Sequence, residues 1–211
     1  PKENEVGYDI YLLSGYRRSL ARHMRKTNMT HLAAINLGLD MCAALTVSRN
    51  AGYLYADLKP ENIFVCHDRE FRINDLGFLK LDSLKYTSMP ERYIGTYTAP
   101  EIVDAFSDIN PTIDVYAAGL ILYQVYNGGA LPFEGRATGE PLPAPAYADY
   151  ELAEIILKAC APDPKDRWQD PYEMGQSLVA YMQRNGVNDT PIVTSLEIHD
   201  QPTEAAVSEP A

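Results

Sequence analysis

The sequence has little cysteine, no surplus of positive charge and no long apolar run. Its three cysteines (Cys42, Cys66 and Cys160) stand singly among apolar neighbours, a pattern typical of reduced core thiols rather than of disulfides or a metal site. The net charge of −11 at pH 7 disfavours nucleic acid and anionic membrane as the main partner. No apolar run approaches the length of a membrane-spanning helix, and no signal peptide opens the chain. We therefore expect a cytoplasmic protein with no membrane segment and no bound nucleic acid.

What is present suffices for a hydrophobic core. Hydrophobic residues make up 46% of the 211 positions, so one folded domain is the default expectation. Capping residues such as Thr30 and Asp170, and stop signals such as Gly52 and Gly186, mark helix ends. Together with the apolar periodicity they predict an α+β fold that is predominantly helical. The predicted elements are a strand at 8–14, a helix at 30–50, strands at 63–65 and 71–73, and helices at 114–126, 152–161 and 170–184.

Charge is distributed unevenly along the chain. Residues 17–26 form the only basic run, which is either a solvated helix face or a dock for acidic substrates. From Val187 onward the composition shifts to Thr, Pro, Glu and Ala, with five acids and no Lys or Arg. This shift predicts a disordered acidic tail or linker at 187–211.

One short stretch contains several side chains that could bind a metal ion or act as an acid or base. Asp57, Lys59 and Asn62 lie in a single loop that Pro60 stiffens, and Asp75 follows 13 residues after Asn62. Carboxylate and amide oxygens are hard ligands of the kind that Mg²⁺ binds, and an Asp beside a hydroxyl can act as its general base. The stretch is therefore the first candidate for a site that binds a metal ion and moves a proton.

Five short motifs follow one another along the chain. They are the loop from Asp57 to Asn62, Asp75-Leu76-Gly77, Ala99-Pro100-Glu101, Asp114 with Gly119, and Arg167. In this order they resemble the catalytic loop, the metal loop and the supporting residues of eukaryotic-like serine/threonine protein kinases. The resemblance covers residues 8 to 185 and implies the large, C-terminal lobe of such a kinase together with its hinge. A lysine two residues after Asp57 resembles serine/threonine kinases rather than tyrosine kinases.

The resemblance implies a role for each residue of the two loops. Asp57 would orient and deprotonate the acceptor hydroxyl, and Lys59 would contact the transferred phosphoryl group. Asn62 and Asp75 would hold Mg²⁺ against the phosphates of ATP.

The same resemblance implies an adenine site and two structural supports. Phe64 would form the floor beneath the adenine, and backbone groups of Gly15 and Arg17 in the hinge would bind its edge. The supports are an ion pair between Glu101 and Arg167, and Asp114 against the backbone of the catalytic loop.

The resemblance also divides the chain into parts. Residues 1–16 would be the last strand of the small lobe and the hinge, 17–186 the C-terminal lobe, and 187–211 the tail. The sequence has no Gly-rich loop and no strand lysine for the ATP phosphates. We therefore expect a small lobe to precede Pro1 in a longer protein and to be the partner of this lobe. Alone, the fragment would transfer phosphate poorly or not at all.

Some positions depart from the kinase pattern. Tyr55-Ala56 stands where the pattern has His-Arg. Without that arginine, a phosphate on residues 79–97 has no partner at this point, so we expect no activation by arginine-paired phosphorylation. Thr96 takes the place of the threonine that helps to select the substrate hydroxyl.

Two other functions fit part of the pattern. A catalytically silent kinase-like scaffold, or pseudokinase, is favoured by Tyr55-Ala56 and by the absent small lobe, but it has no need of the charged set in the two loops. A small-molecule phosphotransferase typically has a second acid after the metal-loop Asp, where this chain has Gly77. The sequence thus predicts a protein serine/threonine kinase that uses ATP and Mg²⁺ and acts on protein substrates.

Overall fold

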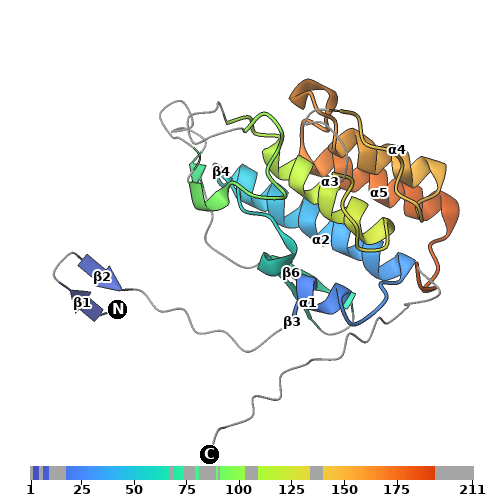
Figure 1. Ribbon diagram of the computed structural model, residues 1–211, viewed down its shortest axis with the longest axis horizontal. Helices are drawn as coiled ribbons and strands as arrows, with labels where there is room; N and C mark the ends of the chain where they lie inside the picture. Colours follow the sequence, from blue (N-terminus) through green and yellow to red (C-terminus); the bar gives the residue numbers. More distant parts are fainter. Residues whose placement is uncertain are drawn as a thin grey trace, which may run out of the picture.

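The computed structural model describes residues 2–4, 7–9, 18–66, 69–73, 79–80, 89, 91–102, 109–133 and 140–192 (Figure 1). Three residues of the predicted site, Gly15, Arg17 and Asp75, lie outside them. Near the N-terminus, strand β1 (Lys2–Asn4) pairs antiparallel with β2 (Gly7–Asp9). The strand predicted at 8–14 is described only at its first two residues, and its pairing with the polar residues 2–4 was not predicted.

Four helices form the body of the molecule: α2 (His31–Asn50), α3 (Ile113–Tyr126), α4 (Tyr150–Ala159) and α5 (Pro171–Asn185). Helix α2 packs against α3 and α5, and α4 packs against the same two helices, so the four lie side by side in Figure 1. All four helices were predicted, each within two residues of its observed ends.

The helix ends follow from local chemistry. The Thr30 hydroxyl accepts a hydrogen bond from the Ala33 N–H (3.2 Å) and so caps α2. The Asp170 carboxylate accepts from the Tyr172 N–H (2.8 Å) at the start of α5. Gly186 ends α5 in the left-handed conformation (φ 60°), which glycine adopts without steric cost.

Two glycines let the helices approach closely. A Cβ at Gly119 of α3 would lie 2.5 Å from the Ala159 Cβ of α4, and a Cβ at Gly38 of α2 would lie 2.8 Å from a methyl group of Leu178 on α5. At Gly119 any larger residue would push α3 and α4 apart, whereas at Gly38 the side chain of Leu178 would have to move.

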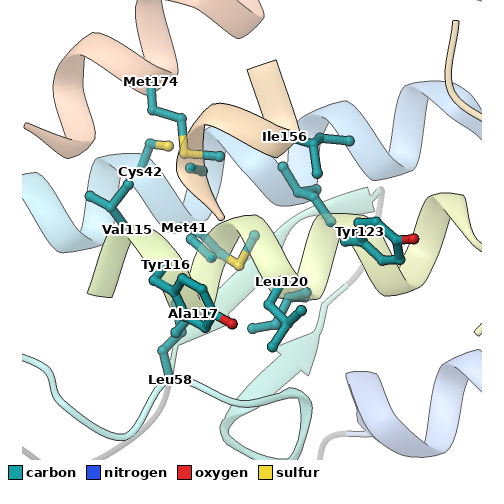
Figure 2. Close-up of a cluster of buried hydrophobic side chains, with 14 of the residues drawn as sticks. Met41, Cys42, Leu58, Val115, Tyr116, Ala117, Leu120, Tyr123, Ile156 and Met174 are labelled. Carbon is teal, nitrogen blue, oxygen red and sulfur yellow. The ribbon is translucent and has the colours of Figure 1, made fainter. Parts of the chain in front are cut away.

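Helix α3 is the centre of the core. Thirteen of its fourteen residues are buried, so the helix has no polar face and must lie in the interior, as its sequence predicts. Figure 2 shows side chains of the neighbouring elements meeting around it, among them Met41 from α2, Ile156 from α4 and Met174 from α5.

Helix α2 corrects one expectation from the sequence. With 20 residues, it is long and apolar enough by length and composition to cross a membrane, although no run of that length was expected. In this structure Ile35, Met41 and Leu45 of α2 are buried in the core, so its apolar character is used for packing against α3 and α5.

Short strands frame the loop that carries the candidate site. Strand β4 (Tyr53–Leu54) precedes the loop, and a 3₁₀ turn, η1 (Pro60–Asn62), leads into β5 (Ile63–Val65). Strand β5 lies between β3 (Arg18–Ser19) and β6 (Phe71–Ile73), whereas β4 pairs with β7 (Leu79–Lys80).

The register of these strands joins both ends of the loop to the segment that contains the predicted metal loop. Ile63, just after Asn62, is opposite Ile73, and Leu54, just before Tyr55, is opposite Leu79. The chain therefore enters and leaves residues 74–78 beside the two ends of residues 55–62.

Residues 187–192 differ from the expectation of a tail that starts at Val187. The His31 N–H donates to the Thr190 carbonyl oxygen (2.9 Å), and the Ile192 N–H donates to the Met29 carbonyl oxygen (2.9 Å). The Asp189 carboxylate accepts from the Thr30 hydroxyl (2.7 Å) and also pairs with Arg69. These contacts make residues 187–192 part of the folded lobe, while 193–211 lie outside the described residues.

Candidate active site

The predicted catalytic loop brings three polar side chains together. The Lys59 Nζ donates to Asp57 Oδ1 (2.8 Å), and the Asn62 amide nitrogen donates to Asp57 Oδ2 (2.9 Å) and to the Asp57 carbonyl oxygen (3.0 Å). The turn η1, which Pro60 begins, sets the spacing between Lys59 and Asn62. Because its nitrogen is engaged with Asp57, the Asn62 side chain keeps its Oδ1 as an acceptor, and that oxygen accepts nothing from the rest of the described chain.

A buried carboxylate holds the backbone in front of Asp57. The N–H groups of Tyr55 and Ala56 donate to the two oxygens of Asp114, both at 2.8 Å. Ala56 has a φ of 66°, which costs a residue with a Cβ about 1–2 kcal/mol. The two hydrogen bonds offset that cost and fix the direction in which the chain presents Asp57. The predicted role of Asp114 as a support of the loop backbone matches this geometry.

Burial dominates the ionisation of Asp114. Desolvation raises the pKa of this carboxyl to about 6, against the opposing effect of the two N–H donors and, more weakly, of Arg49. The carboxylate form accepts both N–H groups without rearrangement, so near pH 7 the side chain is ionised inside the core.

A pocket of about 130 Å³ lies beside the loop. Its walls come from residues 56–59 and 93–99, with Met89, Ile102 and the first turns of α3. The Tyr97 hydroxyl donates to Gln124 Oε1 of α3 (2.6 Å), and burial raises the pKa of Tyr97 to about 12. Tyr97 therefore stays neutral and fixes the segment 93–99 to the core.

The segment 93–102 is anchored again at its far end by a buried ion pair. The Arg167 guanidinium donates to both oxygens of Glu101 (2.8 and 2.7 Å), as predicted. It also donates to the carbonyl oxygens of Ala161 (2.8 Å) and Pro162 (3.1 Å) and faces the ring of Tyr116. Arg167 is fully buried, and these partners satisfy it where an unpaired charge would be very costly.

The remaining predicted residues have mixed outcomes. Phe64 lies in β5, half-buried, between Ser19 of β3 and Arg72 of β6. Thr96 lines the pocket, but the hydroxyl that organises the segment is that of Thr98, which donates to the Tyr93 carbonyl oxygen (3.0 Å). The roles of Gly15, Arg17 and Asp75 stay predictions because these residues lie outside the described ones.

Sequence reasoning missed the Tyr97–Gln124 hydrogen bond and the left-handed Ala56. The only signal for the first was the polar Gln124 near the end of a helix that is mostly apolar after Asp114. Nothing in the sequence indicated the left-handed conformation of Ala56, since alanine rarely adopts a positive φ.

Similarity to known proteins identifies the family of the chain. Residues 5–183 match the family model of the protein kinase domain. The chain belongs to the protein kinase family. This kinase chain is 31% identical over 167 residues to the serine/threonine-protein kinase PknB of Mycobacterium tuberculosis, covering 72% of the chain and 26% of PknB.

Other relatives are similar to this kinase chain to a comparable degree. The probable serine/threonine-protein kinase CE0033 of Corynebacterium efficiens is 30% identical over 175 residues, covering 74% of the chain and 26% of CE0033. PknB of Mycolicibacterium smegmatis is 28% identical over 180 residues, covering 78% of the chain and 28% of that protein. The matched part of the chain thus spans about a quarter of the length of these relatives. The resemblance inferred from the motifs is confirmed at the level of the family.

Proposed function

We propose that this chain is the large lobe of a protein serine/threonine kinase, which transfers the γ-phosphate of ATP to a Ser or Thr hydroxyl of a protein. The observation that carries the proposal is the set of hydrogen bonds joining Asp57, Lys59 and Asn62 on a backbone held by Asp114. A generic helical lobe has no physical reason to place a base, a cation and an amide ligand on one short turn. The serine/threonine kinases among its relatives support the same class of acceptor.

In this proposal Asp57 accepts the proton of the substrate hydroxyl. The side chain of Asp57 is 17% exposed and that of Lys59 34% exposed, so both can be reached from the adjoining pocket. When substrate enters, the Lys59 ammonium can turn from Asp57 to the transferred phosphoryl group and stabilise its negative charge. Asp57 would then face the hydroxyl, held by the Asn62 amide. Such general base catalysis contributes about 10²–10⁴ in rate.

The loop fits a magnesium ion at Asn62. The hydrogen bonds of its nitrogen direct Oδ1 away from Asp57, and an amide oxygen is a hard ligand suited to Mg²⁺. Asp75 would supply the second protein ligand. Its position two residues after Ile73, which is opposite Ile63, supports that assignment. When bound, Mg²⁺ neutralises charge on the ATP phosphates; the chain's own task is to orient Asn62 and Asp75.

The proposal includes an adenine site and a partner lobe. Phe64 would lie beneath the adenine, and backbone groups of Gly15 and Arg17 would bind its edge. A small lobe carrying a Gly-rich loop and a lysine would cover the ATP phosphates from the other side.

Two further features belong to the proposed function. Ala56 has only a methyl group where a phosphate-binding arginine would stand, which supports activation without arginine-paired phosphorylation. Cys42 and Cys160 are buried, and burial raises the pKa of Cys42 to about 12. Inert core thiols of this kind support a cytoplasmic location.

The test is phosphoryl transfer by the longer protein that carries the preceding coding sequence. We expect ATP-dependent phosphorylation of Ser or Thr peptides, and a loss of at least about 10²-fold in kcat for Asp57→Asn. We expect Asp75→Asn to abolish transfer at every Mg²⁺ concentration, and transfer that persists unchanged in this variant would refute the metal role of Asp75. The exposed Asp166→Asn, in the turn before Arg167, is the matched control and should retain full activity.

The outcomes separate the candidates. Equal activity of wild-type protein and Asp57→Asn would show that another group carries the chemistry. A wild-type protein that binds ATP or protein partners but transfers no phosphate to any peptide would instead establish the silent scaffold.

A further inference from the structure

The described structure has a basic face that the proposed chemistry does not use. It consists of Arg18 on β3 and of Arg22, Arg25 and Lys26 in and directly after α1 (Leu20–Met24), and we call it the α1 basic face. All four residues are exposed. The sequence has no acidic residue between Asp9 and Asp40, although the whole chain carries a net charge of −11. Positive charge is therefore concentrated here against the overall balance.

Three of the four cations of the face have no carboxylate partner within the described residues. Arg18, Arg25 and Lys26 form no ion pair there, whereas four arginines elsewhere in the described chain each face a carboxylate. Those paired arginines are Arg69, Arg72, Arg167 and Arg184. The α1 basic face thus presents cations to whatever approaches it from solution.

The α1 basic face adjoins the catalytic loop. Helix α1 buries Leu20 and packs against η1, the turn that carries Asn62, and against β5, which starts directly after it. Strand β3 pairs with the same β5, with Arg18 opposite Val65. A peptide with its hydroxyl at Asp57 can therefore extend over α1 within a few residues.

The charge of the face comes from the arginines and the lysine. Burial, and to a smaller extent the neighbouring Arg18, lowers the pKa of His23. His23 is therefore mainly neutral near pH 7, and the charge of the face at that pH comes from its arginines and its lysine.

We propose that the α1 basic face binds Asp and Glu side chains of the protein substrate that flank the phosphorylated Ser or Thr. The proposal rests on the proposed kinase function and names the substrate class of that site. Each contact between exposed charges is weak, but several act together, and the attraction also raises the rate of encounter. The substrate class is thus an acidic segment around the acceptor residue.

The binding test uses chain 1–211 and fluorescence anisotropy. One labelled peptide carries a central Ser with four flanking Glu residues, and its partner carries Gln at the same four positions. We expect the Glu peptide to bind about tenfold more tightly at low salt. The advantage should fade as ionic strength rises, because a salt concentration of about 0.1 M screens exposed charges beyond about 10 Å.

Charge reversal locates the contact. Arg25→Glu combined with Lys26→Glu should weaken binding of the Glu peptide about tenfold and leave the Gln peptide unaffected. Lys165→Glu is the matched control, since Lys165 is an exposed lysine in η5 (Pro164–Asp166) that forms no ion pair within the described residues. An unchanged Tm for each variant would exclude unfolding, because all these positions are exposed.

Three outcomes would overturn the proposal. The first is equal binding of the two peptides, and the second is an equal loss of binding in the Lys165→Glu control. The third concerns the acidic segment 193–211 of this chain. If an unlabelled peptide of that sequence competes more tightly than the Glu peptide, the α1 basic face binds this segment rather than a substrate.

Transfer assays separate this inference from the proposed function. In the longer kinase, charge reversal at Arg25 and Lys26 should raise KM for the Glu peptide about tenfold and leave kcat unchanged. Phosphorylation that ignores the flanking charge would refute the inference and leave the kinase intact. Charge-dependent binding without any transfer would refute the kinase and leave the acidic-peptide site.

Discussion

Asp114 offers a decisive test of how the fold shapes the site. Its carboxylate is fully buried and accepts the N–H groups of Tyr55 and Ala56 at 2.8 Å each. Asp114→Ala would leave both donors buried without partners, at about 1–3 kcal/mol each. It would also leave the left-handed Ala56 unsupported and create a small cavity. We expect a loss of about 3–5 kcal/mol in the free energy of unfolding.

Urea unfolding of the chain and hydrogen exchange at Tyr55 and Ala56 would measure this effect. The two amides should lose protection in Asp114→Ala more than the core amides of α3 do. Asp163→Ala is a matched control, because the Asp163 carboxylate also accepts a backbone N–H, that of Lys165 (2.9 Å), but at an exposed site. A loss below about 1 kcal/mol in Asp114→Ala, similar to that expected for the control, would refute the view that this carboxylate holds the loop.

The pH dependence of stability gives the same residue a second signature. Burial raises the folded-state pKa of Asp114 to about 6, so between about pH 4 and pH 6 the folded state binds more protons than the unfolded state. Stability contributed by this group therefore rises as the pH falls from 7 to 5, by about 1 kcal/mol. Asp114→Asn lacks a titrating group, so the stability gap between it and wild type should widen at pH 5. A gap that narrows would contradict the assignment.

Three further variants test other parts of the structure. Ala56→Gly should stabilise the lobe by up to about 1 kcal/mol in urea unfolding, because glycine adopts a φ of 66° without strain; a loss of stability would contradict the strain. Arg167→Lys should cost about 3 kcal/mol or more, since lysine cannot make the paired bonds to Glu101, and a cost near zero would contradict the importance of that geometry. In the longer kinase that we propose, replacing Ser83, Thr87 and Ser88 together by Ala should leave kcat within about twofold, because Ala56 cannot pair with a phosphate there. A complete loss of transfer would show that a phosphate in this segment is needed.

Much of the fold could be predicted because its determinants are local. Thr30 and Asp170 cap helices with their own side chains, and α3 is so apolar that only a buried position suits it. The partners of Asp114 and Arg167 were predicted from the kinase resemblance, since a buried charge needs a partner that the family pattern supplies. At each of these positions the chemistry of the side chain allows only one kind of environment: a helix end, the core, or a buried site with a charged or hydrogen-bonding partner.

Other features depend on contacts that the sequence does not announce. The pairing of Lys2–Asn4 with Gly7–Asp9 involves backbone groups in a stretch without apolar alternation. Residues 187–192 have a polar composition typical of a tail, yet Thr190 and Ile192 bond to the backbone beside Thr30. Backbone hydrogen bonds between residues about 160 positions apart leave no trace in composition or periodicity.

The relative strengths of the contacts suggest how the site can work. The contact of Lys59 with Asp57 is partly exposed, and such ion pairs are worth only about 0–1 kcal/mol. The buried bonds from Asp114 to the loop backbone are each more costly to break, as is the pair between Glu101 and Arg167. In the proposed function, substrate would therefore displace the contact between Asp57 and Lys59 at little cost, while the backbone that orients these side chains keeps its shape. Phosphoryl transfer by positioning requires this combination of a stable backbone and side chains that are only weakly bound to each other.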